Sequence, residues 1–185
     1  MKGFERFQQH LNNLFEKKPK IFTNKSSTEG LDDVLSIVYE NTPEEGYITG
    51  LTYGLSLINK EEWKFGRPEL CICVESQNTA WGDVVGYIAN DLREKSQFRF
   101  GQIIDFGEKI SDDSKMSAFL ISAPNIFEKE DCFDINIGLE YKINIAQLYP
   151  IYAEEIEVYN KIGYEKFISH PNFDTYNLKR KMVMA

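Results

Sequence analysis

Large and small side chains alternate along residues 47–57 with a period of two. The large positions are Tyr47, Thr49, Leu51, Tyr53, Leu55 and Leu57, and the positions between them include Gly50, Thr52, Gly54 and Ser56. Because successive side chains of a strand point to opposite faces, this pattern predicts a strand with one packed face and one face that admits only small groups. Gly50 and Gly54 therefore indicate close approach of a helix or a partner backbone, and not a phosphate-binding loop. The pattern breaks at residues 59–68 and resumes as a second predicted strand over residues 69–75.

Helical spacing is clearest over residues 80–95. Apolar side chains recur there at the separations of one helix face, at Trp81, Val84, Val85, Ile88, Ala89 and Leu92. This spacing predicts an amphipathic helix that packs on the sheet. Similar stripes predict helices over residues 3–17 and 152–162, and a short helix over residues 164–170.

Several shorter apolar runs predict further strands. They occupy residues 33–41, 102–106, 118–123 and 133–149, the last with a bend at Gly138. A turn at residues 42–46 joins the first of these strands to the strand that begins at Tyr47, which favours antiparallel pairing. Residues 21–31 are polar and predict a surface loop. The predicted fold class is α+β, with one mixed, largely antiparallel sheet and a few helices packed on it.

The length of the chain, 185 residues, suits one domain with short flanks. We expect residues 1–25 to form an N-terminal amphipathic helix and a connector, residues 26–172 the α+β domain, and residues 173–185 a C-terminal tail. The sequence has no stretch of about 18 apolar residues and no hydrophobic signal core at its N-terminus, so we expect a cytoplasmic protein.

Charge is unevenly distributed along the chain, whose net charge is −8. Residues 1–25 carry six basic and two acidic side chains, whereas residues 26–75 carry three basic and ten acidic ones. Residues 105–140 carry three basic and nine acidic side chains. A negative field repels nucleic acid and anionic membranes and attracts basic macromolecules. We therefore expect the partner to be a protein with a basic surface, and neither nucleic acid nor a membrane.

Metal and nucleophile chemistry find little support in the sequence. The two histidines, His10 and His170, lie far apart, and Cys71-x-Cys73 lacks the spacing of a zinc knuckle. With Cys132 the cysteines number three, which makes no disulfide framework, and we expect Cys71 and Cys73 to be buried as small apolar side chains. The sequence contains no G-x-S-x-G motif. We therefore expect no metal, no cofactor and no catalytic residue.

Adjacent carboxylates are frequent along the chain. The pairs include Asp32-Asp33, Glu44-Glu45, Glu61-Glu62, Asp112-Asp113 and Glu154-Glu155. General acid–base catalysis requires carboxylates in unlike environments, one of them desolvated, and adjacent residues in turns do not provide this. Most of the pairs are therefore interpreted as solvated loop charges. Glu154 and Glu155 open a predicted helix, where the helix dipole favours negative charge, so we interpret this pair as structural.

The predicted loop over residues 59–68 carries two aromatic side chains, Trp63 and Phe65, among charged neighbours. Such side chains more often fold back onto the sheet, but they can also stay exposed and anchor an interface. Both alternatives remain open from the sequence. The candidate partner-binding residues are Glu44, Glu45, Glu61, Glu62, Trp63, Phe65, Asp112 and Asp113.

Four short motifs resemble, in their order and spacing, the suppressor-of-fused (SUFU) domain family. They are Thr52-Tyr53-Gly54-Leu55-Ser56, Pro68-Glu69-Leu70, Leu148-Tyr149-Pro150-Ile151 with Glu154-Glu155, and Gly163-Tyr164-Glu165-Lys166-Phe167. The resemblance covers residues 33–170. It implies a SUFU-like α+β fold and a non-catalytic protein-binding module, and the bacterial members of the family look like immunity proteins of toxin–immunity pairs. It thus implies a bacterial antitoxin that binds a cognate toxin, such as a nuclease, and blocks its active site.

Two other functions remain open. One is a regulatory adaptor that sequesters an endogenous protein, for instance by adding a strand of the partner to an exposed sheet edge. The other is an enzyme that acts on small molecules, which would need a pocket between the sheet and the helix over residues 80–95, with polar groups converging in it. The sequence also leaves the oligomeric state open.

Overall fold

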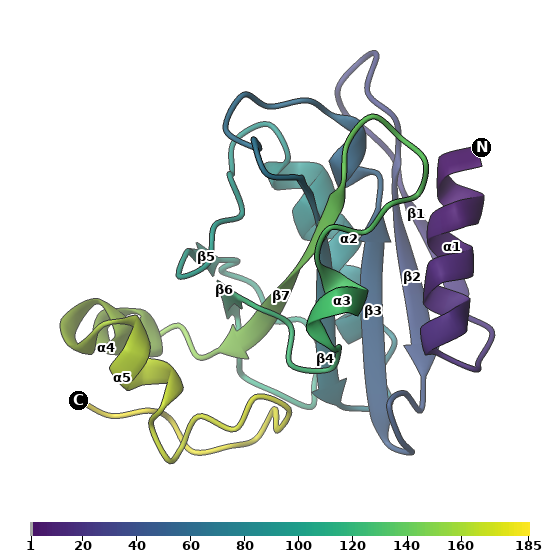
Figure 1. Cartoon of the computed structure of the whole chain (residues 1–185). Helices are drawn as coiled ribbons and strands as arrows, with labels where there is room; N and C mark the ends of the chain where they lie inside the picture. The colour runs from purple at the N-terminus through teal and green to yellow at the C-terminus, as the bar shows by residue number, and fades with distance from the viewer. Residues whose placement is uncertain (1) are drawn as a thin grey trace.

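Seven strands form one continuous sheet in the computed structural model, which describes residues 2–185 (Figure 1). The strands are β1 (Lys20–Asn24), β2 (Val34–Glu40), β3 (Tyr47–Tyr53), β4 (Arg67–Glu75), β5 (Ile103–Asp105), β6 (Ala118–Ser122) and β7 (Ile143–Ile151). Their order across the sheet is β1-β2-β3-β4-β7-β6-β5. Neighbouring strands are antiparallel, except for the parallel pair β4 and β7. The predicted mixed, largely antiparallel α+β fold is confirmed.

Helices cover both faces of this sheet. Within residues 2–185 they are α1 (Lys2–Leu14), α2 (Ala80–Leu92), α3 (Lys129–Cys132), α4 (Glu155–Ile162), α5 (Tyr164–Ile168) and the 3-10 helix η1 (Leu55–Leu57). α2 lies against β2, β3 and β4 on one face, and α1 lies on the opposite face (Figure 1). α4 and α5 lie at the far side of the sheet, by β6 and β7.

Two glycines allow α2 to lie close to the sheet. A Cβ atom on Gly50 of β3 would lie 2.1 Å from the carbonyl oxygen of Gly82 in α2, and a Cβ atom on Gly82 would lie 2.6 Å from the side chain of Val38. No larger residue fits at either position without moving the helix away. The expectation that small residues on this face of β3 admit a helix is confirmed.

Alternating side chains of the strands fill the core on the two faces. The core under α2 includes Val34, Leu70, Ile72, Trp81, Val85 and Leu148. The opposite face has two clusters, one with Phe7, Leu11, Ile37 and Leu51 and the other with Leu120, Ile151, Phe167 and Val183. Side chains of α1 and of residues 173–185 thus pack on the sheet, and Lys20–Asn24 are part of it as β1. Cys71 and Cys73 are buried free thiols on β4, as expected.

Two strands differ from what the sequence pattern predicted: β1 was not expected, and β3 ends earlier. Residues 21–31 were expected to form a polar loop, but Lys20–Asn24 form β1, which pairs with β2 at the edge of the sheet. An edge strand has a neighbouring strand on one side only and is more exposed to solvent, so polar side chains are compatible with its pairing. β3 was expected to reach Leu57, but it ends at Tyr53, because Gly54 turns with φ 129° into η1.

The segment before β7 also differs from the expectation of a strand over residues 133–149. β7 begins at Ile143, and the only strand-like pairing before it is a single bridge between Ile135 and Ile143. Asp134 and Gly138 have positive φ values of 54° and 72°, which interrupt an extended backbone. The short helix α3 precedes this segment, where no helix was predicted.

Candidate partner-binding surface

Three phenylalanine side chains lie on loops at the end of the sheet where β3 ends and β4 begins. Phe65 is 89% exposed and Phe100 is 51% exposed, whereas Phe133 is half-buried. The rings of Phe100 and Phe133 meet edge to face, with their centroids 6.3 Å apart. We call these three residues the aromatic group. Aromatic side chains are enriched at protein–protein interfaces, and they supply many of the residues that contribute most to binding.

Asn144 is the second residue of β7, and its side chain connects two of these loops. Its side-chain amide donates a hydrogen bond to the carbonyl oxygen of Phe65 (3.0 Å), and its side-chain oxygen accepts one from the amide of Asp134 (2.8 Å). Gly66 has a φ of 128°, and a Cβ atom there would lie 2.5 Å from the amide nitrogen of Asn144. Only glycine therefore fits beside Phe65 in this conformation. The two loops are held against the sheet by specific bonds.

A buried carboxylate supports the start of the loop that carries Phe65. Glu69 on β4 is fully buried and accepts hydrogen bonds from the hydroxyls of Thr52 (2.5 Å) and Ser56 (2.7 Å). It also accepts bonds from the amides of Gly54 (2.9 Å) and Ser56 (3.0 Å). The motif residues Thr52, Gly54, Ser56 and Glu69 are thus one hydrogen-bonded unit. This unit sets the turn from β3 into η1.

The environment of Glu69 shifts its ionisation. Complete burial raises the pKa of Glu69, and the hydrogen bonds from Thr52, Ser56 and Gly54 offset part of that rise. No Lys, Arg or His side chain among residues 2–185 forms an ion pair with it. Raised pKa values also occur at catalytic carboxyls. The Glu69 carboxyl, however, is fully buried, and each of its donors belongs to the turn that it supports.

Arg67 holds the other end of the same loop. Its guanidinium donates hydrogen bonds to the carbonyl oxygen of Ser56 (3.1 Å) and to the side chain of Asn59 (3.1 Å). The guanidinium also lies 3.8 Å from the ring centroid of Tyr141, a distance suited to a cation–π contact. Together Arg67 and Glu69 fix residues 56–67 at both ends. The Phe65 ring projects into solvent from a braced loop.

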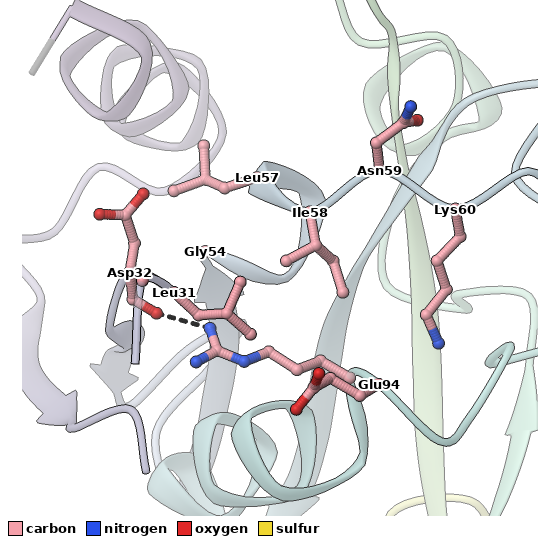
Figure 2. Close-up of a pocket in the computed structure, with 10 residues that line it drawn as sticks. Leu31, Asp32, Gly54, Leu57, Ile58, Asn59, Lys60 and Glu94 are labelled. Carbon is pink, nitrogen blue, oxygen red and sulfur yellow. Dashed lines mark hydrogen bonds between the residues drawn. The ribbon is translucent and has the colours of Figure 1, made fainter. Parts of the chain in front are cut away.

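A groove of about 410 Å³ lies beside this loop, at the C-terminal end of α2 (Figure 2). Its lining combines the apolar side chains Leu31, Leu57 and Ile58 with the charged residues Asp32, Lys60, Arg93 and Glu94. Arg93 is buried and donates hydrogen bonds to the carbonyl oxygen of Asp32 (2.5 Å), drawn dashed in Figure 2, and to the hydroxyl of Ser26 (2.6 Å). Arg93 therefore fastens the connection between β1 and β2 to the end of α2.

The other charged groups of the groove also have structural partners. Lys60 donates to the carbonyl oxygen of Ser96 (2.7 Å), and Glu94 accepts a hydrogen bond from the hydroxyl of Thr28 (2.9 Å). Burial lowers the pKa of Lys60, while the carboxylates of Glu62 and Glu94 act in the opposite direction. Lys60, Arg93 and Glu94 of the groove thus each hold neighbouring segments of the chain together.

The predicted partner-binding residues lie at two opposite ends of the sheet. Glu61, Glu62, Trp63 and Phe65 belong to the connection between η1 and β4. Glu44 and Glu45 form the turn between β2 and β3, at the end where Tyr47 pairs with Glu75. Asp113 lies at that same end, where it accepts a hydrogen bond from Ser76 (2.7 Å). Figure 1 shows the two connections at opposite ends of β3, so the structure brings together four of the eight residues at one end and not the full set.

Trp63 and Phe65 have different environments, although they are two residues apart. Trp63 is half-buried against the core under α2, and its indole donates a hydrogen bond to the carbonyl oxygen of Gln97 (3.2 Å). Phe65 is 89% exposed. Folding back, the commoner outcome for such side chains, is therefore correct for Trp63 and wrong for Phe65. The physical reason is that Asn144 binds the Phe65 backbone and directs the ring outward.

The acidic candidate residues also differ in their exposure and in the bonds that they form. Glu44, Glu45, Glu61, Glu62 and Asp112 are exposed. Asp112 pairs with Lys109 (2.8 Å), and this hydrogen bond lowers the pKa of Asp112. Burial opposes the ionisation of Asp113, but hydrogen bonds from Ser111, Trp81 and Ser76 outweigh burial and lower its pKa. Asp113 therefore fastens the β5–β6 connection to the start of α2.

Glu155 has the structural role that its position at a helix start indicated, but its partners were not predicted. It is fully buried and makes a two-bond ion pair with Arg180 (2.6 and 2.7 Å). It also accepts hydrogen bonds from the amides of Tyr152 (2.9 Å) and Val183 (2.6 Å). The pair fastens the C-terminal residues to the start of α4. The sequence gives no signal for Arg180, which is 25 residues away in a polar segment.

Histidine, cysteine and acidic side chains form no metal site in the part of the chain that the structure describes, since no three of them are grouped to hold an ion. His10 lies 2.8 Å from the carbonyl oxygen of Asp131, and His170 accepts a hydrogen bond from the amide of Asn172 (3.0 Å). Among residues 2–185, no helix combines the length and the apolar character that a membrane crossing requires.

Most of the chain matches a known protein family. A family model for the suppressor of fused protein (SUFU) matches residues 30–181, which is most of the chain. The chain therefore belongs to the SUFU family. The residues around Glu69 and the ion pair between Glu155 and Arg180 lie within the matched range. No curated protein matches the chain by sequence.

Solved structures of this family share the fold. A SUFU homologue from Neisseria gonorrhoeae FA 1090 has a TM-score of 0.72 at 18% identity, with 98% of this chain and 97% of that chain covered. The Sufu–Fu complex gives a TM-score of 0.68 at 15% identity, with 97% and 91% covered. Drosophila Suppressor of Fused gives 0.67 at 16% identity, and this chain covers 50% of it. At these identities the likeness establishes the fold.

Proposed function

We propose that this chain is a non-catalytic protein-binding module that neutralises a cognate toxin by binding it directly. The observation that carries the proposal is the Phe65 ring, 89% exposed on a loop that Glu69, Arg67 and Asn144 hold in place. Covering an exposed ring is favourable because it removes apolar surface from water. A braced loop also loses little conformational entropy on binding. Phe100 and Phe133 extend the apolar area.

Charged residues of both signs surround the aromatic group. The same loops carry Lys60, Lys64 and Arg99 together with Glu61, Glu62 and Asp134. An apolar centre with a polar rim is the usual composition of a protein–protein interface. The net charge of −8 supports a partner with a basic surface, because long-range attraction raises the rate of encounter. A toxin that cleaves nucleic acid is such a partner.

Family membership supports a protein partner in general. One family member was solved as the Sufu–Fu complex, so a SUFU fold can bind another protein. The narrower role of an antitoxin in a bacterial cytoplasm belongs to the proposal. It requires no reaction by this chain, because occupying the active site of the toxin is sufficient.

Co-expression provides the test of this role. Cells that express this chain together with the toxin encoded next to it are expected to grow, whereas cells that express the toxin alone are expected to die. Equal killing in both cultures, with the chain present in soluble form, would show that the proposed neutralisation is wrong.

Replacing Phe65 tests the surface. Phe65→Ala is expected to weaken binding of the toxin about 30-fold, the size typical of a central aromatic residue. Met184→Ala is the matched control, because Met184 is also exposed (64%) but lies at the C-terminus. Isothermal titration calorimetry compares the two variants. Equal affinities would place the contact elsewhere on the molecule.

A regulatory adaptor is the second candidate, and the free edge of the sheet favours it. β1 is an edge strand, and its Ile21 side chain is 44% exposed. An extended segment of a partner could pair with such an edge. Recovery of a housekeeping protein in a pull-down, with no toxin encoded beside the chain, would favour this candidate. Binding would then depend on β1 and not on Phe65.

A further inference from the structure

The 3-10 helix η1 is a short turn that its own backbone holds only weakly. Two backbone hydrogen bonds close it, from Leu57 to Gly54 and from Ile58 to Leu55, and both are 3.4 Å long. Hydrogen bonds between nitrogen and oxygen in proteins are usually roughly 2.7–3.2 Å long. The conformation of η1 therefore depends on bonds that come from outside the turn.

Glu69 supplies shorter bonds that hold this turn. Its carboxyl accepts hydrogen bonds from the amide of Gly54 at 2.9 Å and from the amide and the hydroxyl of Ser56 at 3.0 and 2.7 Å. The hydroxyl of Thr52, which donates at 2.5 Å, links the same carboxyl to the end of β3. Because Glu69 is fully buried, η1 is built around a carboxyl that water does not reach. The loop over residues 58–66, which we call the Phe65 loop, follows directly.

No cation compensates the charge of Glu69. Among residues 2–185 it forms no ion pair, and β7 places the apolar Ile145 beside it. Arg67, two residues earlier on β4, directs its guanidinium to neutral groups of the loop and to the ring of Tyr141. Burial raises the pKa of Tyr141 and of Tyr53 on β3, and the charge of Glu69 raises both further. The two hydroxyls therefore stay neutral between pH 4 and pH 9, where Glu69 can exchange its proton.

The turn also borders the groove drawn in Figure 2. Gly54, Leu57 and Ile58 line this groove, whose volume is about 410 Å³. A small opening of η1 would therefore bring water from the groove to the Glu69 carboxyl. An ionised carboxylate gains far more from water than a neutral carboxyl does. Ionisation of Glu69 thus favours an opened turn, whereas the protonated carboxyl favours the closed one.

We propose that Glu69 makes the Phe65 loop sensitive to pH, because its ionisation loosens η1 and the loop that follows. Arg67 extends the effect to the far end of the loop, since it donates a hydrogen bond to the carbonyl oxygen of Ser56 in η1 (3.1 Å). A loosened loop presents Phe65 in many directions, so binding of a partner then carries the entropic cost of ordering it. Binding at Phe65 should therefore be tightest at acidic pH. This last step rests on the proposed function, whereas the response of the loop does not.

NMR of the free chain tests the response of the loop without a partner. The ¹³C shift of the Glu69 side-chain carboxyl and the amide shifts of residues 54–66 are followed from pH 4 to pH 9. The carboxyl is expected to titrate with a pKa above its ordinary value of 4.5, and the amides are expected to shift with the same midpoint. A carboxyl that stays ionised down to pH 4.5, or protonated up to pH 9, would overturn the proposal. Amides that do not share its midpoint would overturn it as well.

Glu69→Gln is the matched variant, since glutamine keeps one acceptor oxygen but cannot ionise. The midpoint shared by residues 54–66 is expected to disappear in this variant. Glu44→Gln is the control, because Glu44 is an exposed carboxyl in the turn at the opposite end of β3, and it should leave that midpoint unchanged. Retention of the midpoint in Glu69→Gln would show that the loop responds to another group, and the proposal would be wrong.

Binding of the toxin encoded beside the chain gives the second readout. Calorimetry at pH 5 and pH 8 measures its affinity for the parent chain relative to its affinity for Glu69→Gln, so the pH dependence of the toxin itself cancels. We expect this relative affinity to fall about tenfold, the effect of one unit of difference in pKa between the free and the bound chain. A relative affinity that is constant or rises with pH would overturn the link between Glu69 and binding.

The two proposals can fail separately. If residues 54–66 follow the proton of Glu69 but co-expression gives no protection, the toxin-neutralising role is wrong and the pH response of the loop is supported. If co-expression protects the cells and the amides of the loop do not follow that proton, the pH proposal is wrong and the neutralising role stands.

Discussion

Glu69 and Glu155 are both fully buried carboxylates within the range that matches the family, but their charges are compensated differently. Glu155 meets the guanidinium of Arg180 at 2.6 Å, whereas Glu69 receives only neutral hydroxyl and amide donors. Breaking a buried ion pair leaves an isolated charge, which is far more costly than losing one neutral hydrogen bond. The two sites therefore contribute to stability in different ways.

The two carboxylates also hold different parts of the molecule. Glu155 and Arg180 join α4 to the C-terminal residues, 25 positions apart. Glu69 shapes the turn from β3 into η1 and so sets the base of the loop that presents Phe65. Glu155 thus holds the C-terminal residues against α4, whereas Glu69 supports the loop of the proposed binding surface. The variants below test this difference.

Arg180→Met should have the largest effect on stability. It keeps an apolar stem near Phe173 but leaves Glu155 buried without its cation, so we predict a loss of about 3–5 kcal/mol in the free energy of unfolding. Urea denaturation followed by circular dichroism measures it. Adding Glu155→Gln to Arg180→Met should restore part of the loss, because the stranded charge is removed. A loss below about 1 kcal/mol would contradict a buried ion pair at this position.

Glu69→Ala should rank second. It strands the donors of Thr52, Gly54 and Ser56 in the interior, so we predict a loss of about 2–3 kcal/mol in the free energy of unfolding. Glu69→Gln keeps the shape and one acceptor oxygen, and the predicted loss is about 1 kcal/mol. Chemical denaturation compares the two variants with the parent chain. Equal losses for Ala and Gln would mean that the hydrogen bonds contribute nothing beyond packing.

The pH dependence of stability should show whether the folded state favours the protonated or the ionised form of Glu69. Burial raises the folded-state pKa of Glu69 above its ordinary value of 4.5, so the folded state favours the protonated carboxyl. The stability that this group contributes is fully present below pH 4.5 and is lost as pH rises through the folded-state pKa. The difference in urea midpoint between the parent chain and Glu69→Gln should therefore decrease from pH 4 to pH 8. A difference that grows with pH would show that the carboxylate form is the one stabilised by folding. Glu44→Gln corrects for changes in surface charge.

Phe65→Ala should have the smallest effect on the fold. Because the ring is 89% exposed, little apolar contact is lost, and we predict a change within about 0.5 kcal/mol in the free energy of unfolding. The same urea series measures it. A loss near that of Glu69→Ala would mean that the ring packs against the protein and is not available to a partner.

Periodicity predicted the elements whose two faces differ most. The stripe over residues 80–95 produced α2, because its apolar face must be buried on the sheet. The alternating residues Ile135, Ile137 and Leu139 pack on the core and Phe133 is half-buried beside them, yet these residues form no strand. Alternation reports which side chains are buried, whereas a strand also needs a neighbour with free backbone groups. Ile143 onwards already pairs with β4 and β6, which leaves the preceding residues with one bridge.

The candidate surface was predictable only in part. Phe65 was among the predicted residues, but Phe100 and Phe133 were not, because they reach the same region from distant parts of the chain. Phe98 and Phe100 in an otherwise polar segment were an available signal. The outward direction of Phe65 depends on the long-range bond from Asn144, 79 positions away, which local pattern cannot reveal. The resemblance to the family pointed to Glu69, whose role is to support the loop and not to contact a partner.

Hydrogen–deuterium exchange of the chain, free and bound to the protein encoded beside it, probes where the partner sits. The account predicts slower exchange in the bound state over residues 59–66, 97–101 and 133–134, with little change at the β2–β3 turn. Protection confined to that turn or to β1, with those three loops unchanged, would contradict it.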